Sequence, residues 1–388
     1  MLQILKNPFR LYFPIGILFG LWGIFLWVLF FYQKVSYPGI YHAEMMIFGF
    51  YTHIAMGFLM TAIPRFTGTN SMTRAELAIG LGLSIVFFIV AFRDLSRAYL
   101  PFLFFAEISF LLAFFVRRLF IRQSNPPPTF AFLFAGLVCA FIGGLAVLLN
   151  FLDITTLKIN GYDLIYYGWT MGPMLGVGGM LIPRIVGYLN QQIQPVIHTK
   201  AIDSKRPYRV MGIWACIFLV SQFGFAIWQL DLFLYLRQLV LSVVFLKFWK
   251  IYKWPPNKGY LIKGLWLSSW FFLLGTWLAT VDPSRRIHDM HFYFVGAVSL
   301  MIGCIATRVV VAHGNYPSTD ESHSKWLLGV IVFLILAMLT RVLAPWTKGY
   351  FMHLAVASFL WSVAYLCWTI KYVPRIFLPQ KESSKTNC

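Results

Sequence analysis

Charged residues are scarce in this sequence. Asp, Glu, Lys and Arg make up 12% of its 388 residues, whereas hydrophobic residues make up 59% and aromatic residues 19%. A soluble domain cannot bury that much apolar surface, so the composition excludes an ordinary soluble protein. It predicts an all-α polytopic membrane protein whose surroundings are the lipid bilayer.

Acidic residues are the scarcest charged class, with 13 Asp and Glu against 32 Lys and Arg and a net charge of +19. Such an excess can indicate nucleic-acid binding. Here the basic residues lie in short loops between apolar runs, which is typical of the cytoplasmic loops of membrane proteins. We therefore expect no nucleic-acid partner.

Cysteine is also rare, and no C-x-x-C spacing occurs among the five cysteines Cys139, Cys216, Cys304, Cys367 and Cys388. Four of them fall inside apolar runs. This pattern supports neither a disulfide framework nor a metal site built from thiolates.

Long apolar runs are abundant. About twelve of them are long enough to cross a bilayer as helices. They form one membrane domain over residues 1–388 and lie near 11–33, 42–64, 75–92, 97–120, 129–152, 163–184, 209–229, 231–251, 260–280, 287–312, 325–344 and 350–371.

The distribution of Lys and Arg predicts that both termini are cytoplasmic. Lys6 and Arg10 precede the first run, and no small-residue cleavage site follows it, so we expect an uncleaved first helix. With this end inside, most basic residues fall on the inner side. Residues 372–388 then form a cytoplasmic tail.

The chain repeats weakly along its length. The second, sixth and tenth predicted helices end in TAIPRFTG, GMLIPRIVG and CIATRVVVAHG, and their arginines Arg65, Arg184 and Arg308 recur every four helices. This spacing suggests three four-helix units around a pseudo-threefold axis. The alternative is that these arginines simply snorkel at cytoplasmic helix ends.

Histidines gather at one side of the predicted membrane. His42 opens the second helix, His288 and His291 open the tenth and His353 opens the twelfth, all on the outer side. Neutral imidazole is a common ligand of haem iron and of copper, and either metal can use several converging histidines. The alternative is that interfacial histidines face lipid headgroups.

Two further histidines lie at other depths. His53 follows His42 by eleven residues, about three turns of helix, so it is deeper but on the same face. Below His42 this face carries Gly49 and other small residues, which would let a flat macrocycle lie against the helix. Close helix packing explains such glycines equally well. His313 ends the tenth helix at the inner side, while His198 and His323 lie in loops.

Two carboxyl groups lie inside apolar runs. Glu107 falls at the middle of the fourth helix, where a carboxyl is protonated or paired, and proton relays use such groups. Its alternative role is a structural hydrogen bond to a neighbouring helix. Glu44 is two residues from His42 and so projects from a different face. We treat Glu44 and Glu107 as candidate catalytic groups.

Several motifs, taken together and in order, resemble those of the NnrS family of bacterial membrane proteins. The segments HAEMMIFGF and GFLMTAIPRFTGT resemble the family signature in the second helix, and HFYFVGAVSLMIGCIATRVVVAHG (291–314) resembles its tenth helix. TRVLAP (340–345) and LWSVAYLCWTIKYVPRIFLP (360–379) resemble its last two helices. The resemblance covers nearly the whole chain.

The resemblance implies binding of haem b and copper, a location in the bacterial inner membrane and a role in relieving nitrosative stress. His42, His291 and His313 match the family's histidines, and Arg308 matches its arginine. One position departs from the pattern. The family commonly reads H-x-H-E in the second helix, and this chain has Glu44 where the second histidine stands.

The four-helix spacing is also distantly similar to the catalytic subunit of haem–copper oxidases and nitric oxide reductases. The predicted sixth and seventh helices contain no histidine, so the copper triad of those oxidases is absent from this sequence. Copper would need other ligands, such as His288, His353, Met171 or Met174.

These features lead to one main functional hypothesis and two alternatives. The main one is a haem protein that binds nitric oxide and reduces it to nitrous oxide at an outer-facing metal site. The sequence contains no recognisable electron-entry domain, so this reaction needs an external donor, a quinol or a redox protein. The alternatives are a non-catalytic sensor or metal-handling protein, and a haem-free transporter.

Overall fold

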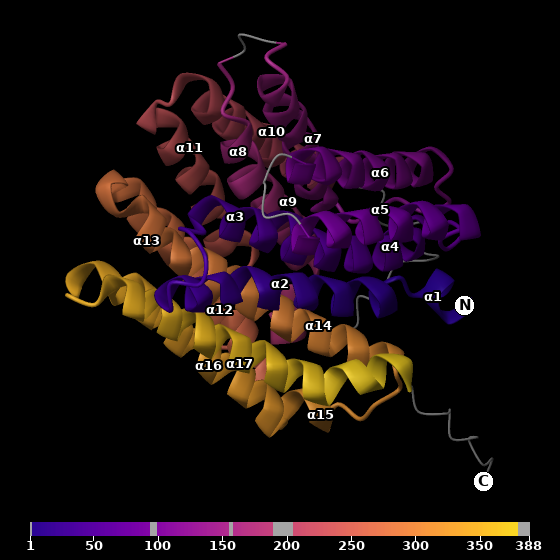
Figure 1. Cartoon of the computed structure of the whole chain (residues 1–388). Helices are drawn as coiled ribbons and strands as arrows, with labels where there is room; N and C mark the ends of the chain where they lie inside the picture. The colour runs from indigo at the N-terminus through magenta and orange to yellow at the C-terminus, as the bar shows by residue number, and fades with distance from the viewer. Residues whose placement is uncertain (1, 94–98, 155–157, 189–204, 379–388) are drawn as a thin grey trace. The chain divides into compact units, whose positions relative to one another are not determined.

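The computed structural model describes residues 2–93, 99–154, 158–188 and 205–378 (Figure 1). Within these ranges the regular secondary structure is helical and contains no strand. Ten of the helices are long and apolar enough to cross a bilayer. The prediction of an all-α membrane protein is confirmed.

Each of the twelve predicted runs is helical over most of its described residues, but two of these helices are not among those ten. Residues 161–186 carry glycine and proline where a typical membrane span has larger apolar residues. Residues 231–248 contain three charged side chains, namely Asp231, Arg237 and Lys247. Apolar runs therefore locate the helices. Among the described residues, ten of these helices are long and apolar enough to span a membrane.

The chain divides into two compact units, each described by itself. Unit 1 is Met1–Gly23 with Pro38–Tyr252, and unit 2 is Ile24–Tyr37 with Lys253–Cys388. Helix α2 (Phe9–Phe31) contributes residues to both. The single domain and the pseudo-threefold axis predicted from the sequence stay predictions.

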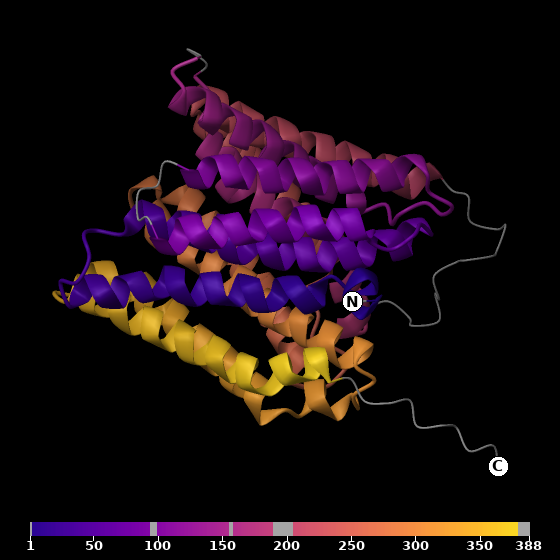
Figure 2. The ribbon, with the colours of Figure 1, turned by 45° about the vertical axis from the view of Figure 1, so that its right-hand side comes forward.

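Unit 1 contains the helices that bring the buried polar residues together. α4 and α5 each pack against α6, and α7 packs against both α6 and α9 (Figure 1; Figure 2). The elements of this unit, besides α2, are α1 (Leu2–Lys6), α3 (Gly39–Glu44), η1 (Met45–Tyr51), α4 (Thr52–Thr67), α5 (Arg74–Arg93), α6 (Leu100–Phe120), α7 (Phe130–Phe151), α8 (Gly161–Asp163), η3 (Leu164–Trp169), α9 (Thr170–Val186), α10 (Lys205–Trp228), α11 (Asp231–Ser242) and η4 (Val243–Phe248).

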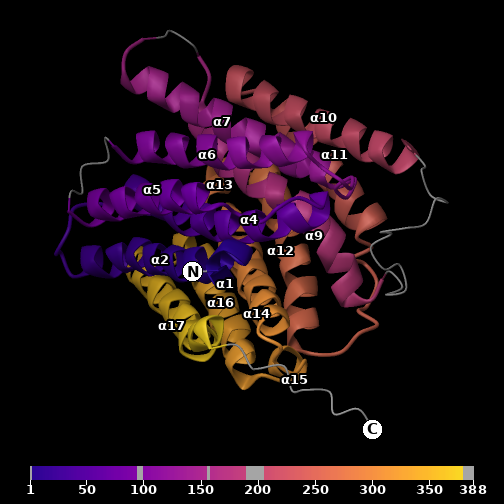
Figure 3. The same ribbon diagram turned by 90° about the vertical axis from the view of Figure 1, so that its right-hand side faces the viewer.

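Unit 2 is built around a long helical hairpin. α16 and α17, orange to yellow in Figure 3, pack along each other, and α14 packs against both. The elements of this unit are α12 (Tyr260–Val281), η5 (Pro283–Arg285), α13 (Arg286–His291), η6 (Phe292–Ser299), α14 (Leu300–His313), α15 (Thr319–Ser322), α16 (Lys325–Leu343), η7 (Ala344–Trp346) and α17 (Tyr350–Phe377).

The helices begin and end where the local sequence directs them to. Thr73 and Glu76 form a capping box at the start of α5, because Thr73 N donates to Glu76 Oε2 (2.8 Å) and Glu76 N donates to Thr73 Oγ1 (3.2 Å). α4 and α9 each end at a glycine with a left-handed backbone, Gly68 (φ 65°) and Gly187 (φ 98°).

The second, sixth and tenth predicted helices share an unusual interruption. Each begins with a short α-helical segment, continues as a π-helical segment and then returns to the α-helical form. These π-helical segments are η1, η3 and η6. Single-turn π-helical insertions are uncommon and are frequent at functional sites. The three helices therefore share a local structure as well as a terminal arginine.

Two of the π-helical segments use the same hydroxyl arrangement. Thr52 Oγ1 donates to Ile47 O (2.8 Å), and Ser299 Oγ donates to Phe294 O (3.0 Å), each reaching five residues back along the chain. A π-helical turn leaves backbone carbonyls without their normal partners, and a nearby hydroxyl can satisfy one of them. The hydroxyls thus stabilise the interruption in both compact units.

An indole group packs against each of these hydroxyls. In unit 1 Trp169 Nε1 donates to Thr52 Oγ1 (3.1 Å), and in unit 2 Trp361 Nε1 donates to Ser299 Oγ (3.1 Å). All four side chains are buried. The second and tenth predicted helices are therefore anchored by the same kind of contact, in one case from η3 and in the other from α17.

The arginines that first indicated the repeat are exposed, with Arg65 and Arg184 in the last turn of their helices and Arg308 five residues before the end of α14. Arg65 Nη2 donates to Asn7 Oδ1 (2.8 Å), and Arg308 forms an ion pair with Glu321. Arg184 is also exposed. Exposed positions near helix ends agree with the snorkelling alternative for these three side chains.

Candidate functional site

The candidate histidines are divided between the two compact units. Unit 1 holds His42 and His53, and unit 2 holds the remaining described histidines, His288, His291, His313, His323 and His353. His198 lies outside the described residues. The local environment of each ring decides which of its nitrogens can bind a metal.

His42 lies in α3, just before η1, and is half-buried. Its Nδ1 is 2.9 Å from the backbone oxygen of Gly23. A carbonyl can only accept, so Nδ1 carries the proton and the lone pair of the neutral ring is on Nε2. This arrangement, with one ring nitrogen bonded to a backbone carbonyl, is typical of metal-binding histidines.

Glu44 points to a different part of unit 1. Its side chain is buried and its Oε1 accepts a hydrogen bond from the Tyr162 hydroxyl (2.9 Å). The carboxyl that stands where the family commonly has a second histidine is therefore joined to α8.

His53 and Glu107 form a buried pair inside unit 1. His53 Nδ1 is 2.8 Å from Gly49 O, and His53 Nε2 is 3.3 Å from Glu107 Oε1. Both side chains have 0% exposure. The sequence placed the two groups in the middle of separate helices, and the packing of α4 on α6 brings them together.

Helix α2 packs on the small-residue face of the second predicted helix, the face that carries Gly49 and Gly57. A Cβ at Gly49 would lie 2.7 Å from the Cβ of Phe19, and one at Gly57 would lie 2.9 Å from the Cβ of Tyr12. Glycine-rich α9 packs on α7 in the same way, since a Cβ at Gly172 would meet the Cα of Gly136. These contacts favour close helix packing over a surface for a flat macrocycle.

His288 is bound to a buried arginine. Its Nδ1 is 2.7 Å from Nη1 of Arg341, whose residue is only 8% exposed. A guanidinium group can only donate, so Nδ1 accepts and the proton of the neutral ring is on Nε2. In this state neither ring nitrogen offers a lone pair to a metal. In the sequence, Arg341 stands out only as part of the TRVLAP motif.

Two other histidines, both in unit 2, form the same kind of hydrogen bond as His42, from Nδ1 to a backbone carbonyl. His291 Nδ1 is 2.6 Å from Ile287 O, and His313 Nδ1 is 2.9 Å from Val309 O. Each bond to a carbonyl places the lone pair of the neutral ring on Nε2. His353 differs from them, because its Nδ1 is buried and has no hydrogen-bond partner in the described part of the chain.

No group of three or more His, Cys, Asp or Glu side chains is placed to hold a metal ion within the described residues. The candidate copper ligands each have their own separate surroundings. His288 is bound to Arg341, Met171 is buried in unit 1 and Met174 is half-buried there. The donor set of a haem is different, since it needs only one or two imidazole nitrogens.

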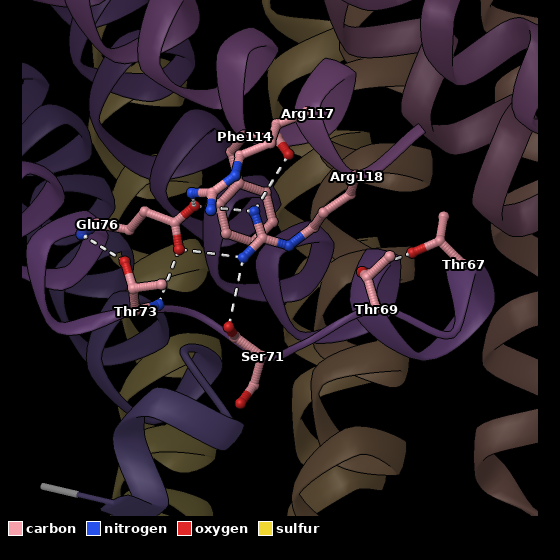
Figure 4. A network of polar contacts seen from close by, with 8 residues as sticks. All are labelled: Thr67, Thr69, Ser71, Thr73, Glu76, Phe114, Arg117 and Arg118. Carbon is pink, nitrogen blue, oxygen red and sulfur yellow. Dashed lines mark hydrogen bonds and ion pairs between the residues drawn. The ribbon is translucent and has the colours of Figure 1, made fainter. Parts of the chain in front are cut away.

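A polar network in unit 1 was not anticipated from the sequence (Figure 4). Arg118 Nη1 and Nη2 donate to Glu76 Oε1 (2.9 Å) and Oε2 (3.0 Å), and the Arg118 guanidinium lies over the ring of Phe114. Arg118 lies in the last turn of α6, where basic side chains are commonly exposed, yet its residue is 3% exposed. The signal that could have found the network is the T-x-x-E spacing of Thr73 and Glu76, a capping box pattern.

The sequence matches the NnrS protein family over residues 3–380. The chain belongs to the NnrS family. The resemblance seen in the motifs is thereby confirmed over almost the whole sequence. A comparison with curated proteins gives no match.

Proposed function

We propose that this NnrS-family protein binds haem b, with His42 and His291 as candidate ligands, each within its own unit, and acts in nitric oxide metabolism, protecting the cell against nitrosative stress. The observation that supports this choice is the state of the two rings. In each, Nδ1 donates to a backbone carbonyl, at 2.9 Å for His42 and 2.6 Å for His291, so that Nε2 carries the lone pair.

The position of these histidines in their helices supports the same choice. His42 lies three residues before η1, and His291 is the residue immediately before η6. Both therefore stand at the start of a π-helical segment, a feature that is frequent at functional sites. Both rings are half-buried rather than enclosed in the core.

When bound, haem iron supplies a redox-active centre with an open or exchangeable position for a gas ligand. Copper is part of the proposal only through the family resemblance, and we assign it no ligand. The pairing of His288 with Arg341 removes His288 from the residues we would test first.

We also propose that the protein reduces nitric oxide to nitrous oxide. In this reaction two nitric oxide molecules, two electrons and two protons give one nitrous oxide and one water. An external quinol or redox protein would supply the electrons. Glu44, two residues from His42 and hydrogen-bonded to Tyr162, is the carboxyl we propose for handling protons near that histidine. We further propose an inner-membrane location with both termini cytoplasmic.

Optical spectroscopy of the detergent-purified protein tests haem binding. We expect a Soret band in the wild-type protein, and its loss or shift in His42→Ala and in His291→Ala. His323→Ala is the matched control, because His323 is an exposed histidine of unit 2. Its Nδ1 lies 2.8 Å from the hydroxyl of the neighbouring Ser322. Wild-type spectra in both ligand variants would show that the assignment is wrong.

Two further measurements separate the alternative functions. A wild-type protein without a Soret band, prepared from haem-replete cells, would favour the haem-free transporter. If haem is present, anaerobic consumption of nitric oxide with a reductant distinguishes an enzyme from a sensor, because only the enzyme consumes more nitric oxide than one binding equivalent.

A further inference from the structure

A third polar group lies beside the His53–Glu107 pair. Tyr12, on α2, is fully buried, and its ring centroid is 6.3 Å from that of His53. The Tyr12 hydroxyl occupies the space beside Gly80, where a Cβ would collide with it. Helices α2, α4, α5 and α6 thus build one polar site inside unit 1.

Four polar atoms of this site have no hydrogen-bond partner in the part of the chain that the structure describes. His53 Nε2, both carboxyl oxygens of Glu107 and the Tyr12 hydroxyl are buried and form no hydrogen bond within the described residues. Buried polar atoms are nearly always paired, because leaving one unpaired is costly. Several of them at one place indicate that the place binds a small hydrogen-bonding ligand, either water or a proton.

The geometry of the pair requires one shared proton. Gly49 O can only accept, so His53 Nδ1 keeps its proton, and His53 Nε2 faces Glu107 Oε1 at 3.3 Å. With a neutral ring and an ionised carboxyl, two lone pairs would face each other in a buried place. One proton between the two atoms removes this repulsion and leaves the pair with no net charge.

The shared proton belongs on Glu107 rather than on His53. Both residues have 0% exposure, and burial in an apolar environment disfavours charged forms. The aromatic rings of Phe19 and Phe87 lie 4.8 and 5.5 Å from the His53 ring, centroid to centroid, and cover it. A carboxylic acid that donates to a neutral imidazole carries no formal charge and suits this environment.

One face of α5 connects the pair to the network of Figure 4. Glu76, Gly80 and Ser84 follow one another at intervals of one helical turn, about 6 Å each. Ser84 is buried and its hydroxyl donates to Gly80 O (3.0 Å). The Tyr12 hydroxyl, beside Gly80, therefore lies about one turn of α5 from the Glu76–Arg118 ion pair.

We propose that Tyr12, His53 and Glu107 form a proton-binding site that exchanges its proton, through the Tyr12 hydroxyl and bound water, with the Glu76–Arg118 end of unit 1. The titratable groups of the site are Tyr12 on α2, His53 on α4 and Glu107 on α6. The ion pair of Glu76 on α5 with Arg118 on α6 lies at the other end of the proposed route. The proposal stands on unit 1 alone and is independent of haem binding.

The proton movements balance along this route. Glu107 passes its proton, through bound water, to the Tyr12 hydroxyl, which at the same time releases its own proton to water on the Glu76 side and forms hydronium there. The reverse transfer, from hydronium through Tyr12 to the Glu107 carboxylate, restores the carboxylic acid. The His53 ring stays neutral throughout, and its Nδ1–H bond to Gly49 does not change.

Infrared spectroscopy of the purified protein tests the site. We expect a carbonyl stretching band of a protonated carboxyl group in the wild-type protein at neutral pH, absent from Glu107→Gln and shifted in Glu107→Asp. The aspartate variant keeps the test available if the glutamine variant does not fold. A wild-type protein without such a band, or a band that persists in Glu107→Gln, would overturn the proposal.

Transfer into D₂O tests the route. We expect the deuterium shift of the Glu107 band to slow by about tenfold or more in Tyr12→Phe, since the relaying hydroxyl is gone. Tyr51→Phe is the control, because Tyr51 is also a buried tyrosine of unit 1, but its hydroxyl donates to Thr170 O (2.9 Å). A wild-type exchange rate in Tyr12→Phe, or equal slowing in both variants, would refute the role of Tyr12.

Discussion

Arg117 and Arg118 contact the same carboxylate, yet we expect very different effects from replacing them. Arg118 reaches Glu76 with two hydrogen bonds of 2.9 and 3.0 Å, and its side chain is 4% exposed. Arg117 Nη1 is 3.5 Å from Glu76 Oε1, and its side chain is 62% exposed. Figure 4 shows both guanidinium groups next to the Glu76 carboxylate.

The magnitudes follow from burial. Removing one partner of a buried ion pair costs about 3–5 kcal/mol, because the remaining charge stays in a medium of low polarity. Removing a solvent-exposed partner costs about 0–1 kcal/mol. Arg118→Gln also loses the contact with the Phe114 ring, whose centroid is 3.3 Å from the guanidinium carbon. We therefore expect Arg118→Gln to lower the free energy of unfolding by about 3 kcal/mol or more, about a hundredfold in the folding equilibrium.

Unfolding in mixed detergent micelles, with SDS as the denaturant and tryptophan fluorescence as the signal, measures both variants. Arg117→Gln should stay within about 1 kcal/mol of wild type. Equal effects of the two substitutions would refute the reasoning from burial. Glu76→Gln adds a check, since glutamine can still accept the capping bond from Thr73 N and so isolates the loss of charge.

Two further predictions concern packing and topology. Gly172→Ala should lower the free energy of unfolding by about 1–3 kcal/mol, because its Cβ would meet the backbone of Gly136. Gly212→Ala, with open space around it, should be neutral or stabilising by up to about 1 kcal/mol. The same SDS titration measures both, and an unaffected Gly172→Ala would contradict the close contact. In intact cells, a single cysteine at Arg285 should react with an impermeant thiol reagent and one at Lys253 should not; the reverse pattern would place the termini outside.

Much of the helical structure could be predicted from the sequence because apolar length is a local property. The run predicted over 129–152 is the helix Phe130–Phe151, and the run predicted over 260–280 is Tyr260–Val281. The start of α5 could be predicted in the same way, since Thr73 and Glu76 satisfy each other's backbone groups within one turn. Such features need no contact with a distant part of the chain.

The π-helical segments were beyond sequence reasoning. Residues 45–51 and 292–299 are apolar and fit an ordinary α-helix equally well. Their form is stabilised by hydroxyls whose partners are distant tryptophans, Trp169 for Thr52 and Trp361 for Ser299. The indole contacts arise only when the helices pack, so the local sequence does not reveal them.

The sequence by itself determined the membrane class, the positions of the helices, the family and the residue types available for binding a metal or a proton. It placed His53 and Glu107 in the middle of their helices, and it left two explanations for Gly49. Only the tertiary structure decided that His53 faces Glu107, that Phe19 packs on Gly49 and that Arg118 is buried against Glu76. The reason is physical, because hydropathy and helix length depend on neighbouring residues, whereas a partner on another helix depends on which faces pack together.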